Sequence, residues 1–259
     1  MPADEFCEQL SKYFDEFQKA LATNKGDWVI KGFIDVYRNI YTISIDTKVI
    51  SKIIELMIFP LIARFGELNG YKIVLCEYQN HYPDITFISK NNKKIALDLK
   101  STYRIGDNQV NGFTLGAFTG YFRNRGSTKN ITFAYNEYEA HVVLGIIYSR
   151  TKEIIDEQKI HSIEEIDDIV SVVKDFTFLV QEKWKIAGYN PGSGNTKNIG
   201  SIKKIVDLVK GNGPFVPYGK KIFDDYWMNY LTQDMANAID SVIPYSNLDE
   251  YLKWKGLSK

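Results

Sequence analysis

Two aspartates and a lysine occur in an arrangement that could hydrolyse a phosphodiester bond. Asp84 follows a proline, and Asp98 and Lys100 lie in the next apolar stretch of the chain. Side chains two residues apart on a strand point to the same face, so Asp98 and Lys100 would lie together, about 6.6–7 Å apart along the strand. A turn at residues 91–92 would return this strand beside Asp84. The pattern therefore predicts two carboxylates and one ammonium group at one edge of a sheet.

Such a cluster predicts magnesium-dependent chemistry. Two neighbouring carboxylates repel each other, and a hard cation with oxygen ligands relieves that repulsion. Mg²⁺ usually takes one or two carboxylates and keeps positions for a phosphate oxygen and a water molecule. Lys100 would position that water or stabilise charge on phosphorus. The predicted reaction is in-line attack on a phosphodiester, although so short a pattern also fits a solvated surface strand.

Residues 192–197 form a second candidate site, because their types suit contact with DNA bases. Gly192 and Gly194 would let the backbone approach base edges closely. Asn195 can bond to N6 and N7 of adenine, and Thr196 can contact the methyl group of thymine. A plain turn rich in glycine and proline is the alternative interpretation. A P-loop is excluded, because the chain has no G-x-x-x-x-G-K-[ST] motif.

The elements that must position these residues alternate between helices and strands. A long helix is expected from an Asp46 N-cap to residue 68, with Gly70 as its stop, and a hairpin is expected within residues 28–45. The other expected helices are 5–22, 160–174, 199–209, 226–242 and 247–254. The expected strands are 71–77, 84–89, 94–99, 131–133, 141–149 and 176–180. This order predicts an α/β (α+β) fold, a mixed central β-sheet flanked by helices, with residues 1–259 as a single domain.

The composition is that of an ordinary globular protein, with 44% hydrophobic and 25% charged residues. Cys7 and Cys76 are far apart, which argues against a disulfide framework or a cysteine zinc site and suits a reducing cytosol. The N-terminus has no apolar core of a signal peptide. The most apolar stretch, residues 53–65, is interrupted by Glu55 and Pro60 and is too short to span a bilayer. We therefore expect a cytoplasmic protein with no membrane partner.

Charge is balanced overall but unevenly distributed. The chain has 32 basic and 32 acidic residues, which gives no general attraction to a polyanion. Residues 90–130 and 181–221, however, each hold eight basic and two acidic side chains. Such blocks are compatible with a basic cleft on a neutral molecule, and random clustering would give the same counts.

Several separate motifs, in the same order and at similar spacing, resemble one known family. They are Asp46-Thr47-Lys48-Val49, Glu55-Leu56, Asn80-His81-Tyr82-Pro83-Asp84, Asn92 to Ala96 followed by Asp98-x-Lys100, Phe113 to Gly116, Thr128 to Ile131, Trp184 to Gly188, Gly192 to Thr196 and Asn198 to Ile202. Together they resemble the EcoRV-type restriction endonucleases of the PD-(D/E)XK nuclease superfamily. The likeness runs from Asp46 to Ile202 and, more weakly, to Trp254.

The resemblance implies a restriction-endonuclease-like fold and a type II enzyme that cleaves double-stranded DNA with Mg²⁺. It implies that Asp84 and Asp98 are metal ligands and that Lys100 is the catalytic lysine. Glu55 matches a helix glutamate that can bind a second or alternative metal ion. An exposed helix residue is the other interpretation of Glu55.

The resemblance also implies a set of DNA contacts. Residues 188–200 would be a recognition loop that enters the major groove, and residues 79–81 would line the minor groove. The candidate DNA-binding residues are Gly192, Ser193, Gly194, Asn195, Thr196, Lys197, Asn198, Gln79, Asn80, His81, Ser101, Thr102, Thr114, Lys129 and Lys48. The basic residues Arg104, Arg123, Arg125 and Lys129 would attract phosphates without regard to sequence.

The implied target is the palindrome GATATC, cut bluntly at its centre. Lys197 departs from the family pattern, which has threonine there, and this leaves the outer-base preference open. A palindrome cut on both strands calls for a homodimer. Residues 28–45 and 151–166 are the implied dimerisation elements, and a cognate DNA methyltransferase is the implied functional partner.

Two other functions fit the same residues. A structure-specific or repair nuclease would use the same metal core but would prefer nicked, mismatched or branched DNA. A DNA-binding module without catalysis would also agree with the zero net charge. Sequence-specific fragments from a magnesium-dependent digest separate the first interpretation from both of these.

Overall fold

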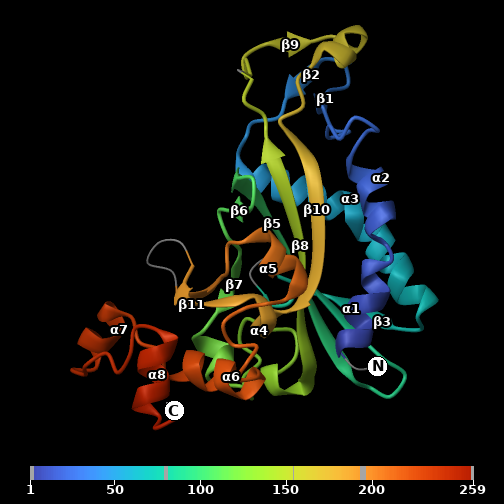
Figure 1. The fold of residues 1–259 in the computed structure, drawn as a ribbon. Coiled ribbons are helices and arrows are strands. Elements are labelled where there is room, and N and C mark those ends of the chain that lie inside the picture. Colours follow the sequence, from blue (N-terminus) through green and yellow to red (C-terminus); the bar gives the residue numbers. More distant parts are fainter. Residues whose placement is uncertain (1–2, 79–80, 154, 193–196, 258–259) are drawn as a thin grey trace.

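The fold is built around a mixed central β-sheet. The computed structural model describes residues 3–78, 81–153, 155–192 and 197–257. Its strands run in the order β10-β8-β5-β4-β3, and β6 pairs with β5 off this path. The bounds are β3 Lys72–Leu75, β4 Ile85–Ile88, β5 Lys94–Gly106, β6 Gln109–Val110, β8 Tyr138–Arg150 and β10 Val173–Glu182. β5 and β8 are parallel, whereas the other pairs are antiparallel. The predicted mixed sheet with flanking helices is confirmed (Figure 1).

The hairpin of β4 and β5 positions the predicted catalytic residues. Its turn contains Asn92 at a φ of 58°, in the left-handed region that asparagine tolerates better than most residues. Ile85 pairs with Leu97 in the antiparallel register. Continuing that register by one residue places Asp84 opposite Asp98, with both side chains on one face of the sheet.

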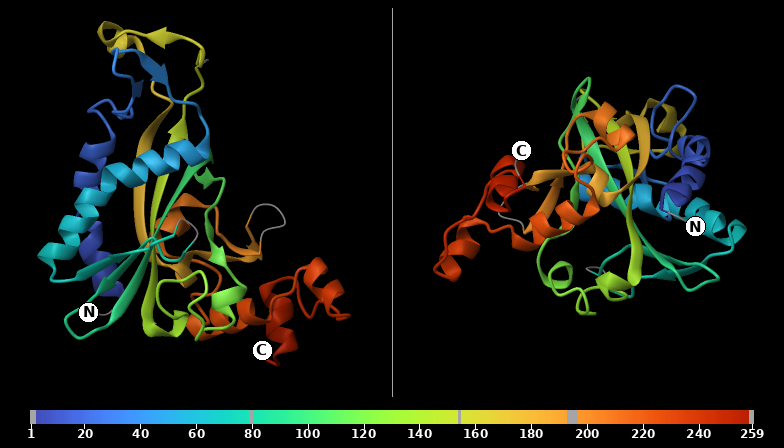
Figure 2. Two further views of the ribbon diagram at one scale, coloured as in Figure 1. Left: turned by 180° about the vertical axis from the view of Figure 1, so that it is seen from behind. Right: turned by 60° about the horizontal axis from the view of Figure 1, so that its bottom comes forward.

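Three helices cover one face of the sheet: α1 Ala3–Ser11, α2 Phe14–Leu21 and α3 Thr47–Leu68. Figure 2 shows α3 crossing this face. Its N-cap is Asp46, whose side chain accepts hydrogen bonds from the amides of Lys48 and Val49, as predicted. The single helix predicted over 5–22 is instead two helices, because the chain bends at residues 12–13. Tyr13 at this bend packs on Phe65, while Phe14 and Phe17 of α2 pack on Phe178 of the sheet.

The opposite face carries a second layer around the sheet β11-β12-β7, with bounds Ala187–Pro191, Asn198–Ser201 and Thr114–Ala117. Short elements surround it: α4 Lys183–Ile186, α5 Ile205–Lys210, η1 Gly120–Phe122 and η2 Tyr135–Glu137. The helix predicted over 199–209 is wrong in its first half. Residues 199–201 pair with β7 and β11, and only the second half becomes α5.

A small sheet of β1 Gly32–Ile34, β2 Ile40–Thr42 and β9 Ile160–His161 forms the far end of the molecule (Figure 1). The predicted hairpin in 28–45 is confirmed, with Arg38 at a φ of 68° in its turn. The helix predicted over 160–174 is wrong. Its start pairs with β2, its middle is the 3₁₀ helix η3 Ile163–Asp168, and its end begins β10. Strand pairing to a distant segment overrides the local helical pattern here.

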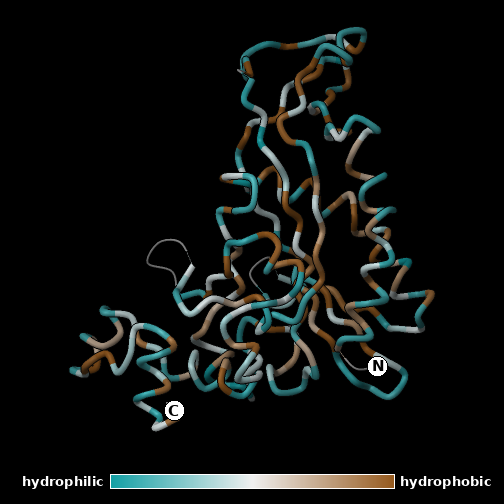
Figure 3. The backbone as a smooth tube through the Cα atoms, viewed as in Figure 1, coloured by the Kyte–Doolittle hydropathy of each residue, from teal (hydrophilic) through white to brown (hydrophobic). Residues whose placement is uncertain are grey.

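The chain ends in three helices: α6 Lys220–Asn229, α7 Gln233–Ala238 and α8 Leu248–Trp254. One hydrophobic core fills the space between the sheet and α1–α3, and a second fills the space between the sheet and the layer of β7, β11 and α6. Hydrophobic residues run along the central strands between these cores (Figure 3). None of the helices in the described part of the chain combines the length and hydrophobicity that a bilayer crossing needs.

Candidate active site

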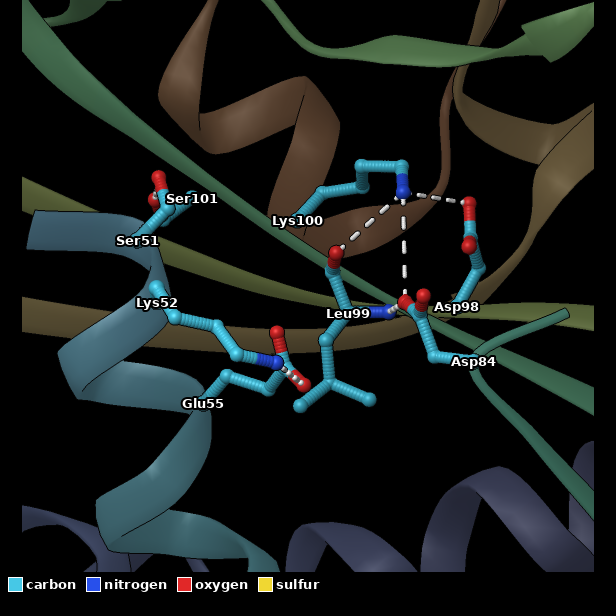
Figure 4. Close-up of polar contacts among 8 residues, drawn as sticks. All are labelled: Ser51, Lys52, Glu55, Asp84, Asp98, Leu99, Lys100 and Ser101. Carbon is cyan, nitrogen blue, oxygen red and sulfur yellow. Dashed lines mark hydrogen bonds and ion pairs between the residues drawn. The ribbon is translucent and has the colours of Figure 1, made fainter. Parts of the chain in front are cut away.

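Asp84, Asp98 and Lys100 lie together at one place on the central sheet (Figure 4). Lys100 Nζ is 2.8 Å from Asp98 Oδ2 and 4.0 Å from Asp84 Oδ2. Asp84 Oδ2 also accepts a hydrogen bond of 2.7 Å from the backbone amide of Leu99. This bond crosses between the two strands of the hairpin and fixes the Asp84 carboxylate beside Asp98. The structure therefore brings together the three residues that the sequence pattern singled out.

The two carboxylates of the site lie in a partly buried environment. Asp98 is buried, while Asp84 and Lys100 have side chains 34% and 27% exposed. Burial, together with the charge of Asp98, raises the pKa of Asp84 to about 7. Burial alone would lower the pKa of Lys100, but the charges of Asp98 and Asp84 outweigh it and raise that pKa. The raised pKa of Asp84 indicates a repulsion that a bound cation would relieve.

The donor set suits a hard cation that also takes ligands from its substrate. Within the described residues no group of three or more His, Cys, Asp or Glu side chains could hold a metal ion. Asp84 and Asp98 offer a pair of carboxylates, and Mg²⁺ usually takes one or two in a protein site. Its other positions would be filled by water and phosphate oxygens. The residues thus fit Mg²⁺, and they do not form a closed structural metal site.

Glu55 lies in the same cleft but outside the cluster. A cleft of about 750 Å³ is lined by Asp84 and, from α3, by Lys48, Lys52 and Glu55. Glu55 is ion-paired with Lys52 at 2.7 Å (Figure 4). Lys52 was not singled out from the sequence, although its position three residues before Glu55 on a helix is a spacing that brings charges together.

α3 is connected to β5 by a pair of hydroxyl groups. Ser51 Oγ and Ser101 Oγ are 2.6 Å apart, and Ser51 also donates to the carbonyl of Thr47. Ser101 follows Lys100 directly, so this contact fixes the distance between the helix and the site. Thr102, the next residue, is buried.

The predicted recognition segment begins and ends beside β7. Gly192 donates its amide to the carbonyl of Asn198 at 2.8 Å, and the carbonyl of Lys197 accepts from Phe118. Thr114 lies against Gly192: a Cβ added at position 192 would be 3.3 Å from Thr114 Oγ1. Thr114 and Lys197 are exposed. Gln79, Asn80, Ser193, Gly194, Asn195 and Thr196 lie outside the described residues.

The remaining residues that were predicted to contact DNA differ in whether their side chains are exposed or are bound by other parts of the protein. Lys48 and Lys129 are exposed, and His81 packs on Tyr78 with ring centroids 4.7 Å apart. The three arginines of the first basic block are instead engaged by the protein. Their partners are Asp224 for Arg125, the carbonyl of Tyr230 for Arg123, and Thr177 with the carbonyl of Asp175 for Arg104. Their charges serve intramolecular contacts, which the sequence could not show because each partner is distant in the chain.

Two comparisons with known proteins match most of the chain. A family model described as "Restriction endonuclease EcoRV" matches residues 24–256. The chain is 38% identical over 249 residues to the type II restriction enzyme EcoRV of Escherichia coli, and this alignment covers 95% of each chain. The matched region includes the β4–β5 hairpin and the segment around residues 188–200.

Proposed function

Because the chain belongs to the EcoRV family of type II restriction endonucleases, we propose that Asp84, Asp98 and Lys100 are the residues with which it hydrolyses DNA. The observation that carries this proposal is their convergence from the two strands of one hairpin, within 4.0 Å of Lys100 Nζ. The chain is a DNA-hydrolysing enzyme by its family. Its own residues supply the hard oxygen donors and the ammonium group that phosphodiester hydrolysis needs.

We propose that Asp84 and Asp98 hold Mg²⁺, with Glu55 as an additional or alternative ligand from α3. When bound, the ion would polarise a phosphate oxygen and lower the pKa of a coordinated water. The Leu99 amide keeps the Asp84 carboxylate aimed at the site. Lys100 is partly exposed, so its ammonium can reach a phosphate and stabilise negative charge as it develops in the transition state.

For the target we propose the palindrome GATATC with blunt cleavage at its centre. Support comes from the resemblance of residues 188–200 to the recognition loop of the family and from the exposure of Thr114 and Lys197 beside its base. Gln79, Asn80, His81, Ser193 to Asn198, Ser101, Thr102, Lys129 and Lys48 are the further proposed DNA contacts. Thr102 is buried, so its contact would be through the backbone or would need a rearrangement.

We propose that the enzyme acts as a homodimer through residues 28–45 and 151–166. Hydrophobic side chains gather on the surface of the small sheet at the far end, and they include Phe33, Ile34, Val36, Tyr37 and Ile160. Exposed apolar groups in one place mark a protein interface. The proposed functional partner is a DNA methyltransferase that protects the host target, and the proposed location is the cytoplasm, where that DNA lies.

A digest of plasmid DNA tests the proposed function directly. Purified protein and Mg²⁺ should cut a plasmid with one GATATC site into a single linear product, and sequencing of the ends should place the cut at the centre. EDTA should abolish cutting. Cutting at another single sequence would replace the proposed target but keep the enzyme class. Preference for nicked or branched DNA over the intact site would contradict sequence-specific restriction.

A further inference from the structure

Lys183 is a buried ammonium group that the proposed chemistry does not use. It is the first residue of α4, directly after β10, and the residue is 2% exposed. Its Nζ has no hydrogen-bond partner among the described residues. An unpaired charge in a protein core is strongly unfavourable, so its presence calls for a compensating interaction.

Aromatic rings provide part of that compensation. Lys183 Nζ lies 5.0 Å from the ring centroid of Tyr82, 5.6 Å from that of Tyr135 and 5.7 Å from that of Phe122. Gly116 of β7 closes the cage, since a Cβ there would be 3.7 Å from Nζ. Cation–π attraction stabilises the ammonium group but does not neutralise it.

The negative charge that attracts Lys183 most is that of Asp98. Burial lowers the pKa of Lys183 to about 8, and Asp98, followed by Asp224, opposes this effect. Asp224 is already paired with Arg125. Asp98 faces the same layer as Lys183. Ala96 lies on the same face of β5 as Asp98, and Val143 is the partner of Asp98 on β8. Both residues belong to the hydrophobic core that surrounds the cage. Asp98 therefore has Lys100 at contact distance and a second ammonium group on its core side.

We propose that Lys183 is a positioning residue that sets the charge balance of the metal site. Together with Lys100 it offsets Asp84 and Asp98, so the protein alone holds a divalent cation weakly. This inference rests on the proposed role of Asp84 and Asp98 as metal ligands.

The direction of the effect follows from the charges. Removing the ammonium of Lys183 makes the carboxylates attract both protons and metal ions more strongly. A divalent ion gains twice as much as a proton from the same change in potential, so the ion gains more than the competing proton. The loss of Lys183 should therefore tighten metal binding in the absence of DNA.

Binding of Mn²⁺ to the protein without DNA tests this proposal, with free Mn²⁺ followed by electron paramagnetic resonance. We expect Lys183→Met to bind Mn²⁺ about three- to tenfold more tightly than the unaltered protein. Lys183→Arg keeps the charge and should keep the original affinity. The matched control is Lys94→Met: Lys94 is also a buried lysine over an aromatic ring, that of Phe133, but it is paired with Glu137. It should leave Mn²⁺ affinity unchanged.

Thermal unfolding separates the proposal from a purely structural role. Lys183→Met should be at least as stable as the unaltered protein, because it removes an unpaired buried charge and fills its place with a flexible apolar chain. If Met prevents folding, the neutral Lys183→Gln carries the same binding test. The role of Lys183 would be overturned if the neutral variant bound Mn²⁺ with unchanged or weaker affinity while the unaltered protein cleaved DNA. An unaltered protein that neither binds Mn²⁺ nor cleaves DNA would overturn the proposed function itself.

Discussion

Lys100 has three oxygen atoms around its ammonium group. Its Nζ touches Asp98 Oδ2, lies near Asp84 Oδ2 and donates to the carbonyl of its neighbour Leu99 at 3.3 Å. Each of these partners is an oxygen atom, and a phosphate group would offer the ammonium group the same kind of acceptor. The Lys100 side chain is 27% exposed, so a phosphate oxygen that replaced one of these partners would keep the ammonium group hydrogen-bonded.

His141 behind the site provides a prediction about stability. Its Nδ1 is 2.8 Å from Tyr82 Oη, and Tyr135 stacks on its ring with centroids 3.8 Å apart. Burial, with nearby Lys183, holds the pKa of His141 well below its usual range, so it is neutral when folded. The unfolded chain takes up a proton below about pH 6.5, and the folded protein does not, so the free energy of unfolding should fall as pH drops.

The expected contribution of His141 is at most about 1.4 kcal/mol per pH unit below pH 6.5. Urea unfolding between pH 7.5 and pH 5 should therefore show a steeper loss of stability for the original protein than for His141→Gln. Equal slopes for the two proteins would show that His141 is not a buried neutral group.

The three candidate site residues could be recognised in the sequence because their pattern is local. Asp84, Asp98 and Lys100 belong to one hairpin, so strand alternation and one turn suffice to bring them together. Lys183 could not be found this way. Its cage is made by residues from β7, from two 3₁₀ helices and from the segment before β4, and the short segment 183–186 gives no sign of its burial.

At the scale of the element, α3 connects the fold to the cleft. It begins at an aspartate cap, carries Lys48, Lys52 and Glu55 along one side of the cleft, and ends before Gly70 at a φ of 70°. Both ends were predictable, because the cap and the glycine act on neighbouring backbone groups. Two segments that were mispredicted as helix, around 160–174 and 199–201, have distant strands as their partners.

The N-cap of α3 can be tested by Asp46→Ala. Asp46 Oδ1 accepts from Lys48 N at 2.8 Å and from Val49 N at 3.2 Å. The substitution leaves both amides without this partner and should lower the free energy of unfolding by about 1 kcal/mol, as measured by urea denaturation. Asp46→Asn retains an accepting oxygen and should recover most of the loss. A full loss in the asparagine variant would show that charge, not capping, is what matters.

At the scale of the whole molecule, the hydrophobic surface of the small sheet predicts a dimer. Val36→Glu places a charge on a residue that is 90% exposed within the proposed interface. Burying that charge is unfavourable, so the dissociation constant of the dimer, measured by sedimentation, should increase at least about tenfold. Nicked plasmid should accumulate, because the two strands would no longer be cut together. Val242→Glu, at 86% exposure near the C-terminus, is the matched control and should behave as the original protein. An unaffected dimer in the Val36 variant would place the interface elsewhere.

Single-turnover cleavage by Asp98→Asn tests the central claim most directly. Asparagine keeps the shape of the side chain but removes the charge that Lys100 contacts at 2.8 Å. The variant should fold and bind the cognate duplex, yet cut it at least about a hundredfold more slowly, a loss as large as those caused by altering the outer partners of metal ligands. Asp107→Asn, an exposed aspartate at the turn that follows β5, should cut at the original rate. Undiminished cutting by Asp98→Asn would show that the chemistry lies elsewhere in the molecule.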